Sequence, residues 1–188
     1  MTKIFVISGL SGAGKDSVID GLKEAGMNYT WVITTTTRLM RSNETQGNPY
    51  HFVSKDEFEK MVSNNEFFEW AQVYSDYYGN TKKEIEQALL GNKPVILRID
   101  AQGSATIKEK RPEAKVIFLI ADSIKIIKQR LEKRGEDSLE EIEIRLAESK
   151  KEMKTLDQWD YVIINKQGQL KETINQVKQI IEKEFIYN

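Results

Sequence analysis

Four short apolar runs divide the chain and are separated by longer segments of mixed polarity. They are residues 3–8 (KIFVIS), 94–99 (PVILRI), 115–120 (KVIFLI) and 161–165 (YVIIN). Apolar runs of this length, rich in β-branched residues, are typical of strands that are buried on both faces. The runs therefore predict the strands of a parallel sheet.

The segments between these runs have the spacing of amphipathic helices. Two of them begin with a capping box, in which a serine precedes a glutamate by three residues: Ser54 with Glu57, and Ser138 with Glu141. We expect helices at residues 16–25, 54–64, 82–90, 101–110, 123–133, 138–154 and 170–185.

Strands that alternate with helices predict an α/β fold, with a central parallel sheet covered by helices on both faces. Residues 34–81 interrupt this alternation. Short strands are expected at 29–34, 51–54 and 66–74, and residues 35–50 read as a polar loop. We therefore predict a single domain over 1–188, with a core of about 1–33 and 82–188 and a small lobe inserted at about 34–81.

The composition narrows the possible partners. The chain has 188 residues, 30% charged and 39% hydrophobic, with a formal net charge of −1. This balance shows no basic excess of the kind that nucleic-acid binding requires, so we expect no DNA or RNA partner. The absence of cysteine excludes disulfides and thiolate metal sites and fits the cytoplasm. No apolar run is long enough for a membrane span, and the N-terminus is too short for a signal peptide.

A glycine-rich loop follows the first predicted strand. Residues 9–15 (GLSGAGK) have the spacing G-x-x-x-x-G-K. The glycines allow the backbone N–H groups to point at phosphate oxygens, and the following helix adds its positive N-terminal end. Lys15 supplies a mobile positive charge for the outer phosphates. We expect a nucleotide triphosphate to contact Gly9, Ser11, Gly12, Ala13, Gly14, Lys15, Asp16 and Ser17.

Asp16 is unusual, because a hydroxyl residue normally follows the lysine of such a loop. Its carboxylate can coordinate Mg²⁺ directly, since that ion favours carboxylate oxygen. It can instead point away as an acidic residue in the first helical turn, where the helix dipole favours negative charge. Ser17 then supplies a hydroxyl through a water. The sequence leaves these alternatives open.

Residues 34–52 (TTTTRLMRSNETQGNPYHF) indicate a second anion site. Arg38 and Arg41 are three residues apart, and two guanidinium groups can hold a phosphate dianion, with a tyrosine hydroxyl such as that of Tyr50 adding a further hydrogen bond. In the aromatic segment that follows, Glu69 could accept the two N–H groups that guanine offers at N1 and N2. Taken alone, the two stretches are also compatible with a solvated loop and an edge strand.

Together these residues resemble the guanylate kinase family, over essentially the whole chain. The family pattern is met in order by the phosphate loop, then Thr36-Thr37-Arg38, Arg41, Glu44, Gly47, Tyr50, Phe52, Glu66-Phe67, Glu69-Trp70, Tyr77-Tyr78-Gly79, Ile99-Asp100, Gln102-Gly103, Arg134-Gly135 and Asp137-Ser138. The resemblance implies a P-loop kinase fold, in which residues 34–81 form a GMP-binding lobe and residues of about 130–150 form a helical lid.

The resemblance also implies roles for individual residues. The GMP site comprises Thr34, Arg38, Arg41, Glu44, Tyr50, Glu69, Tyr78, Asn80, Thr81, Asp100 and Gly103. On the ATP side the phosphate loop is joined by Arg130, Arg134 and Asn165, the last near adenine. The groups expected to stabilise phosphoryl transfer are Lys15, Arg38, Arg41, Arg134 and Arg145.

Three positions depart from the family pattern. Asn80 replaces a small hydroxyl residue; its amide can donate to guanine O6 but can also accept, which would soften selectivity over adenine. Pro49 replaces aspartate before Tyr50. The third is Asp16, and the spelling G-K-D-S also resembles the loop of ribose bisphosphate kinases, which lack the guanine-reading residues present here.

The resulting prediction is an ATP-dependent guanylate kinase that transfers the γ-phosphate of Mg·ATP to GMP, and also to dGMP. Mg²⁺ is expected to arrive with ATP, with Asp16 as a candidate ligand, and the protein is expected to be a monomer or a homodimer. The single histidine, His51, is expected to be structural. Two alternatives stay open: a kinase of another phosphorylated small molecule such as ribose bisphosphate, and a non-catalytic guanylate-kinase-like module that binds phosphopeptides.

Overall fold

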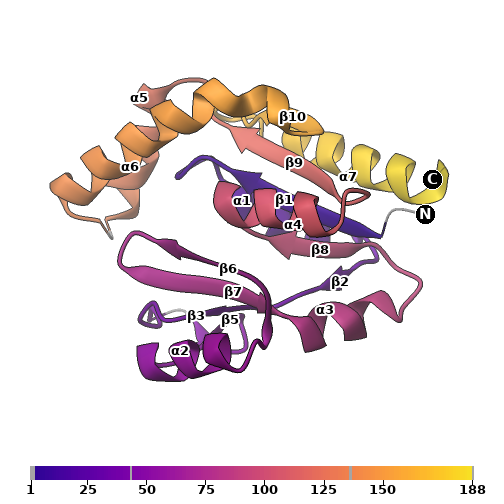
Figure 1. Cartoon of the computed structure of the whole chain (residues 1–188). Coiled ribbons are helices and arrows are strands. Elements are labelled where there is room, and N and C mark those ends of the chain that lie inside the picture. The colour runs from indigo at the N-terminus through magenta and orange to yellow at the C-terminus, as the bar shows by residue number, and fades with distance from the viewer. Residues whose placement is uncertain (1–2, 43, 136, 188) are drawn as a thin grey trace.

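The computed structural model describes residues 3–42, 44–135 and 137–187, which form two sheets and the helices around them (Figure 1). Asn43 in the predicted lobe and Glu136 in the predicted lid lie outside these ranges. The first sheet is parallel, with neighbouring strands in the order β10 (Tyr161–Ile164), β9 (Lys115–Ile120), β1 (Ile4–Gly9), β8 (Val95–Arg98) and β2 (Thr30–Trp31).

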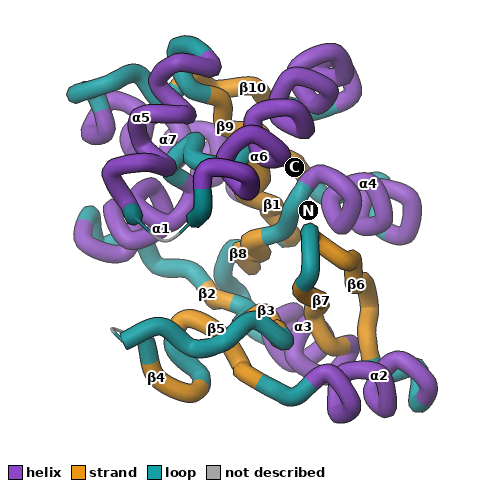
Figure 2. The backbone as a smooth tube through the Cα atoms, turned by 90° about the vertical axis from the view of Figure 1, so that its left-hand side faces the viewer, coloured by secondary structure: helices purple, strands orange, loops and turns teal. Residues whose placement is uncertain are grey.

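Helices connect and cover these strands (Figure 2). They are α1 (Lys15–Glu24), α3 (Lys82–Leu89), α4 (Ala101–Lys110), α5 (Ile124–Arg134), α6 (Leu139–Glu152) with the 3-10 helix η1 (Met153–Gln158), and α7 (Leu170–Tyr187). The α1 helix packs against α7, where Gly21 allows the close approach: a Cβ there would lie 2.1 Å from Cδ1 of Ile174. The α4 helix packs against β1 and β9.

The main core lies between this sheet and its helices. Every residue of β1 is buried, as are all residues of β9 after Lys115, because both strands have neighbours on each side and helices above and below. Continuous burial explains why these strands read as unbroken apolar runs. The predicted α/β class with a central parallel sheet is confirmed.

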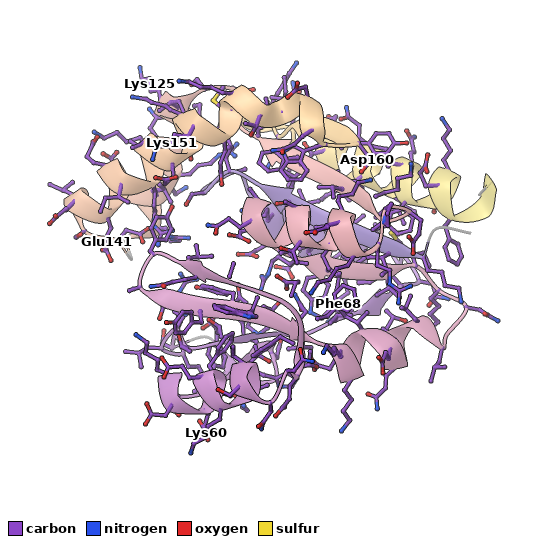
Figure 3. The ribbon with its side chains drawn as sticks, viewed as in Figure 1. Lys60, Phe68, Lys125, Glu141, Lys151 and Asp160 are labelled. Atoms are coloured by element: carbon purple, nitrogen blue, oxygen red, sulfur yellow. The ribbon has the colours of Figure 1, made fainter. Side chains whose placement is uncertain are left out.

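A second sheet is formed by residues between Thr34 and Thr81. Its strand order is β4 (Thr45–Gln46), β5 (Pro49–Phe52), β3 (Thr34–Thr36), β7 (Asp76–Thr81) and β6 (Phe67–Val73). The α2 helix (Lys55–Ser63) covers it, and Phe58 of that helix stacks on Phe67 with ring centroids 4.4 Å apart. Phe68 on the neighbouring position of β6 lies between the two parts of the molecule (Figure 3) and packs against the main core.

Most predicted elements are present within one or two residues, but the segment 29–34 is not one strand. Residues 30–31 pair with β8 in the first sheet, whereas residues 34–36 pair with β5 and β7 in the second. The chain passes from one sheet to the other at Val32 and Ile33. The prediction of a plain polar loop over 35–50 is also wrong, because it contains the end of β3, all of β4 and the start of β5.

Candidate functional site

The glycine-rich loop connects the carboxyl end of β1 to α1, at the edge of the parallel sheet where ligands bind in such folds. Gly9 has a φ of 144°, and a Cβ there would lie 2.2 Å from the carbonyl oxygen of Leu119. Gly14 has a φ of 90° and would place a Cβ 2.5 Å from Nδ2 of Asn165. Both positions therefore require glycine, which agrees with a loop built to present its backbone to phosphate.

Lys15 folds back over this loop. Its Nζ donates to the carbonyl oxygens of Gly9 at 2.6 Å and Leu10 at 3.1 Å. Burial lowers the pKa of Lys15, and the negative charges of neighbouring carboxylates oppose that shift. Among these neighbours, Glu152 at the end of α6 was missed by sequence reasoning; burial raises its pKa to about 7.

Asn165 and Arg130 hold the loop from the outside. The Asn165 amide donates to the carbonyl of Ala13 at 2.8 Å and its oxygen accepts from Thr173 at 3.1 Å. Arg130 donates to the carbonyls of Gly12 and Ala13 at 3.3 Å and to that of Asn165 at 3.0 Å. Both predicted ATP-site residues thus lie at the loop, with their polar groups engaged in shaping it.

The two predicted lid arginines meet at one carboxylate. Arg134 at the end of α5 and Arg145 on α6 both pair with Asp137, the latter at 3.0 Å. Arg145 also donates to the hydroxyl of Ser11 at 3.3 Å, and its guanidinium lies 4.3 Å from the ring centroid of Tyr74. The structure therefore brings Arg145 to the phosphate loop and to the tip of the β6–β7 hairpin.

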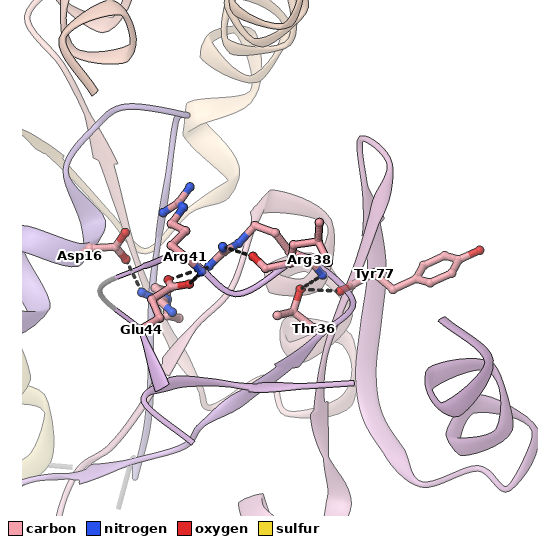
Figure 4. A network of polar contacts seen from close by, with 8 residues as sticks. Asp16, Thr36, Arg38, Arg41, Glu44 and Tyr77 are labelled. Carbon is pink, nitrogen blue, oxygen red and sulfur yellow. Dashed lines mark hydrogen bonds and ion pairs between the residues drawn. The ribbon is translucent and has the colours of Figure 1, made fainter. Parts of the chain in front are cut away.

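Asp16 lies in the first turn of α1 and pairs with Arg98, the last residue of β8 (Figure 4 shows Asp16 and this contact). The Asp16 side chain is 65% exposed, whereas that of Arg98 is 8% exposed. Desolvation by the neighbouring protein acts to raise the pKa of Asp16. The positive charges of Arg98 and Lys15 outweigh this effect, so the pKa of Asp16 is lowered. Neither role predicted for Asp16 included this partner. An arginine within the apolar run 94–99 was the available signal, because a buried charge requires a partner.

On the opposite side of the site, Glu44 organises the two arginines of the 34–52 segment (Figure 4). Its carboxylate accepts two hydrogen bonds from Arg38, at 2.7 and 3.0 Å, and one from the backbone N–H of Arg41 at 2.8 Å. Burial acts to raise the pKa of Glu44, but these hydrogen bonds lower it overall. Glu44 is thus an ionised group that fixes Arg38.

Two tyrosines complete this cationic cluster. The rings of Tyr50 on β5 and Tyr78 on β7 meet edge to face with centroids 5.9 Å apart. The guanidinium of Arg38 lies 5.3 Å from the centre of the Tyr50 ring, and that of Arg98 lies 4.2 Å from it. Burial raises the pKa of Tyr50 to about 12, so its hydroxyl is a donor at neutral pH.

Glu69 and Asn80 face each other across β6 and β7. The Asn80 amide donates to Glu69 at 2.6 Å, and its oxygen accepts from the hydroxyl of Thr34 at 3.2 Å. The same Thr34 hydroxyl lies 3.3 Å from the carbonyl oxygen of Arg98, so it bridges the two sheets. Glu69 is only 3% exposed, and burial raises its pKa to about 7 although the hydrogen bond from Asn80 opposes the shift.

Asp100 and Gly103, at the N-terminus of α4, lie beside Glu69. Asp100 caps α4 by accepting from the N–H of Gly103 at 2.9 Å. A Cβ at position 103 would lie 2.5 Å from a carboxylate oxygen of Glu69, so glycine allows the α4 N-terminus to approach it. Burial raises the pKa of Asp100.

Thr81 and His51 lie on the other face of the second sheet. Thr81 is one position beyond Asn80, so strand alternation turns it away. Its hydroxyl caps α3 by accepting from the backbone N–H of Glu84 at 3.3 Å, and it donates to the Glu84 carboxylate at 3.0 Å. His51 lies 2.8 Å from the other carboxylate oxygen of Glu84 and joins β5 to α3, as a structural residue would.

A cavity of about 520 Å³ lies between the α1 helix and the 34–52 segment. Its lining includes Asp16 from the end of the phosphate loop, Arg98 from β8, and Arg41, Glu44 and Tyr50 from the 34–52 segment. The described part of the chain contains no cluster of three metal-ligating side chains and no helix long and apolar enough to cross a membrane.

Comparison with known proteins gives a consistent result. The family model for guanylate kinase matches residues 1–184. The guanylate kinase of Carboxydothermus hydrogenoformans is 38% identical over 96% of this chain and 88% of its own length. That of Vibrio parahaemolyticus is 41% identical over 86% of this chain and 79% of its own.

A crystal structure of guanylate kinase from Anaplasma phagocytophilum superposes with a TM-score of 0.81 at 28% identity, covering 98% of this chain and 87% of that one. This chain therefore belongs to the guanylate kinase family.

Proposed function

We propose that this guanylate kinase binds the phosphates of ATP at the glycine-rich loop and GMP at the second sheet, and transfers the γ-phosphate across the cavity between them. The single observation that supports this arrangement is that cavity, since Asp16 next to Lys15 lines it together with Arg41 and Tyr50. The cavity thus lies between the first turns of α1, which begin at the phosphate loop, and the cationic 34–52 segment. Transfer between two nucleotides requires adjacent sites of this kind.

The guanine base is assigned to the pocket around Glu69. An ionised Glu69 accepts the N1–H and the exocyclic amine, Thr34 and Asn80 face O6, and Asp100 with Gly103 closes the floor. The buried and hydrogen-bonded position of Glu69 supports this role, because a site built around such a group rejects bases that leave it unpaired.

The monophosphate is assigned to the Arg38, Arg41, Tyr50 and Tyr78 cluster. Arg38 is held by Glu44, which leaves its position fixed before substrate binds. The hydroxyls of the two tyrosines are protonated donors, as the raised pKa of each indicates. Thr81 is left out of this proposal because its hydroxyl is engaged in the α3 cap.

Charge compensation during transfer is assigned to five cations: Lys15, Arg38, Arg41, Arg134 and Arg145. Phosphoryl transfer needs little covalent chemistry from the protein, but it needs alignment, compensation of charge and exclusion of water. Residues of about 34–81 act as the GMP-binding lobe and residues of about 130–150 as the lid that brings the last two arginines.

The residues at the loop fit an Mg²⁺ ion that arrives with ATP. Mg²⁺ is usually held by one or two carboxylates together with substrate phosphates, and Asp16 is the exposed carboxylate next to Lys15. When bound, the ion would neutralise charge on the triphosphate. A monomer or homodimer in the cytoplasm remains part of the proposal.

A substrate panel tests the proposal. Initial rates with Mg·ATP are measured for GMP, dGMP, AMP, CMP, UMP and ribose 1,5-bisphosphate. We expect kcat/KM for GMP to exceed that for AMP by on the order of 10⁴. A preference for another acceptor would contradict the guanine assignment, and loss of ATP binding in calorimetry would contradict the phosphate-loop assignment.

A further inference from the structure

Arg98 is a buried cation that has no assigned role in the phosphate loop or in the proposed GMP site. It is the last residue of β8 and only 8% of its surface is exposed. One guanidinium nitrogen pairs with Asp16, whereas Nε and Nη2 are buried and have no hydrogen-bond partner among the described residues. A buried guanidinium with two unpaired N–H groups is costly unless something else stabilises it.

Aromatic rings supply part of that stabilisation. The Arg98 guanidinium lies 4.2 Å from the ring centroid of Tyr50 and 5.7 Å from that of Trp31. A guanidinium at this separation is attracted to the ring face, and more strongly when water is excluded. Arg98 is therefore held between the carboxylate of Asp16 and the ring of Tyr50.

This position makes Arg98 the contact between the two nucleotide sites. Asp16 belongs to the first turn of α1, directly after Lys15, and Tyr50 belongs to β5 in the second sheet. All three residues line the same cavity. The chain of contacts thus runs from the phosphate loop to the hydroxyl-bearing ring at the monophosphate site.

We propose that Asp16 and Arg98 form a positioning pair for the acceptor phosphate: Asp16 holds Arg98 against the ring of Tyr50, and Arg98 fixes the orientation in which Tyr50 presents its hydroxyl to GMP. This inference rests on the proposed role of Tyr50 in binding the GMP phosphate. It gives Asp16 a function in acceptor binding, although the residue lies in the ATP loop.

A residue of the ATP loop that positions the acceptor phosphate has a distinctive effect on the kinetics. Loss of a group that serves only ATP or its metal raises KM for ATP or shifts the Mg²⁺ requirement. Loss of the pair through Arg98→Met, which leaves Asp16 in place for the metal, should instead raise KM for GMP by about tenfold, which corresponds to about 1.4 kcal/mol. It should change KM for ATP by less than about twofold.

The test is a double-mutant cycle on steady-state kinetics and GMP calorimetry. The variants are Arg98→Met, Asp16→Asn and Tyr50→Phe, alone and combined, with Lys23→Met as the matched control, because Lys23 is another cation that lines the same cavity. Asp16 is largely exposed, so Asp16→Asn tests the pair even if Arg98→Met folds poorly. Thermal unfolding of each variant is recorded in parallel.

We expect Arg98→Met and Asp16→Asn each to weaken GMP binding when introduced into the wild-type protein. In a protein that already carries Tyr50→Phe, each should have little further effect, since coupled residues give non-additive changes. Lys23→Met should match the wild type. Additive effects in the Tyr50→Phe background would overturn the inference, as would a shift in Mg²⁺ dependence with unchanged KM for GMP in Asp16→Asn. If Tyr50→Phe itself leaves GMP binding unchanged, the proposed phosphate site fails as well.

Discussion

Glu69 shows how burial can give one carboxylate a titratable role at physiological pH. It is 3% exposed, receives a hydrogen bond from Asn80 and lies near the carboxylate of Asp100. Burial raises its pKa from 4.5 to about 7. In the proposed guanine site the two N–H groups of the base require ionised Glu69, so the pKa of Glu69 would connect pH to GMP binding.

GMP affinity should therefore depend on pH. Below about pH 7 Glu69 must lose its proton before it can accept from guanine, so Kd for GMP is expected to fall as pH rises and to level off above the pKa. Glu69→Gln should bind GMP weakly and retain only the pH dependence of the nucleotide phosphate itself, with pKa of about 6. Calorimetry between about pH 5.5 and 8.5, which is about 1.5 pH units on either side of the Glu69 pKa of about 7, distinguishes the two proteins. Equal slopes in both proteins would contradict the role of Glu69.

The same shift should appear in the stability of the free protein. Because the pKa of Glu69 is raised in the folded state, the free energy of unfolding falls as pH rises from the unfolded pKa of 4.5 to the folded pKa of about 7. Glu69→Gln should therefore be the more stable protein at pH 8, by about 3 kcal/mol at most. It should have no such advantage at pH 4. Urea denaturation at the two pH values measures this, and an advantage at pH 4 alone would be the wrong sign.

Asn80 is suited to this site because it is neutral. It donates to Glu69 at 2.6 Å and accepts from Thr34. Asn80→Asp would place a second carboxylate beside Glu69 and drive one of them to remain protonated. We expect GMP binding to weaken by on the order of 100-fold, since a lost charge-assisted hydrogen bond of this kind is worth about 1.5–3 kcal/mol. Asn80→Ser, which cannot repel Glu69, is the control and should retain binding.

Helices and strands were predictable where their signals are local. The capping boxes at Ser54 and Ser138 are both present, and the strand at 115–120 has the expected bounds. The signals failed where pairing is long-range. The strand 76–81 (DYYGNT) has no apolar alternation of its own, and it forms because it pairs with β6 and β3.

The site was predictable to a similar extent. Glu44 contacts Arg38 and Arg145 contacts Ser11, so the structure brings these predicted site residues together, whereas their roles in binding stay predictions. The partner of Asp16 was not predictable, because Arg98 is 82 residues away and only the pairing of β1 with β8 brings the two together. Tyr74 was also missed, since a hairpin tip carries no sequence signal for the helix that it will contact.

The two capping boxes provide a controlled comparison between elements. Ser54 and Ser138 bond their N3 residues in the same manner, but α2 covers the second sheet whereas α6 carries Arg145. Replacing either serine by alanine should lower the free energy of unfolding by about 0.5–2 kcal/mol. Only Ser138→Ala should also lower kcat, because fraying of the first turn of α6 displaces Asp137 and the arginines that it holds. If Ser54→Ala and Ser138→Ala changed kcat equally, the expected role of α6 in catalysis would be contradicted.

The molecule as a whole is organised around contacts between parts that belong to different segments of the chain. The β6–β7 hairpin of the second sheet reaches α6, and α6 reaches the phosphate loop (Figure 1). Tyr74 adopts a positive φ of 57° at the hairpin tip, a conformation that bulky residues rarely take. Such strain is tolerated when the surroundings hold the residue in place, and it often marks a functional site.

The contact between Tyr74 and Arg145 should therefore couple acceptor binding to the position of the lid. Tyr74→Ala removes a ring that lies 4.3 Å from the Arg145 guanidinium and relieves the strained backbone only in part. A desolvated interaction of this type is worth up to about 2 kcal/mol, so kcat should fall by on the order of tenfold. ATP hydrolysis in the absence of GMP should rise relative to transfer, because a lid that closes less completely admits water.

Leu90→Ala, at an exposed site, serves as the control and should change neither rate. A wild-type ratio of hydrolysis to transfer in Tyr74→Ala would mean that the second sheet and the lid act independently, and that α6 positions Arg145 without help from the hairpin.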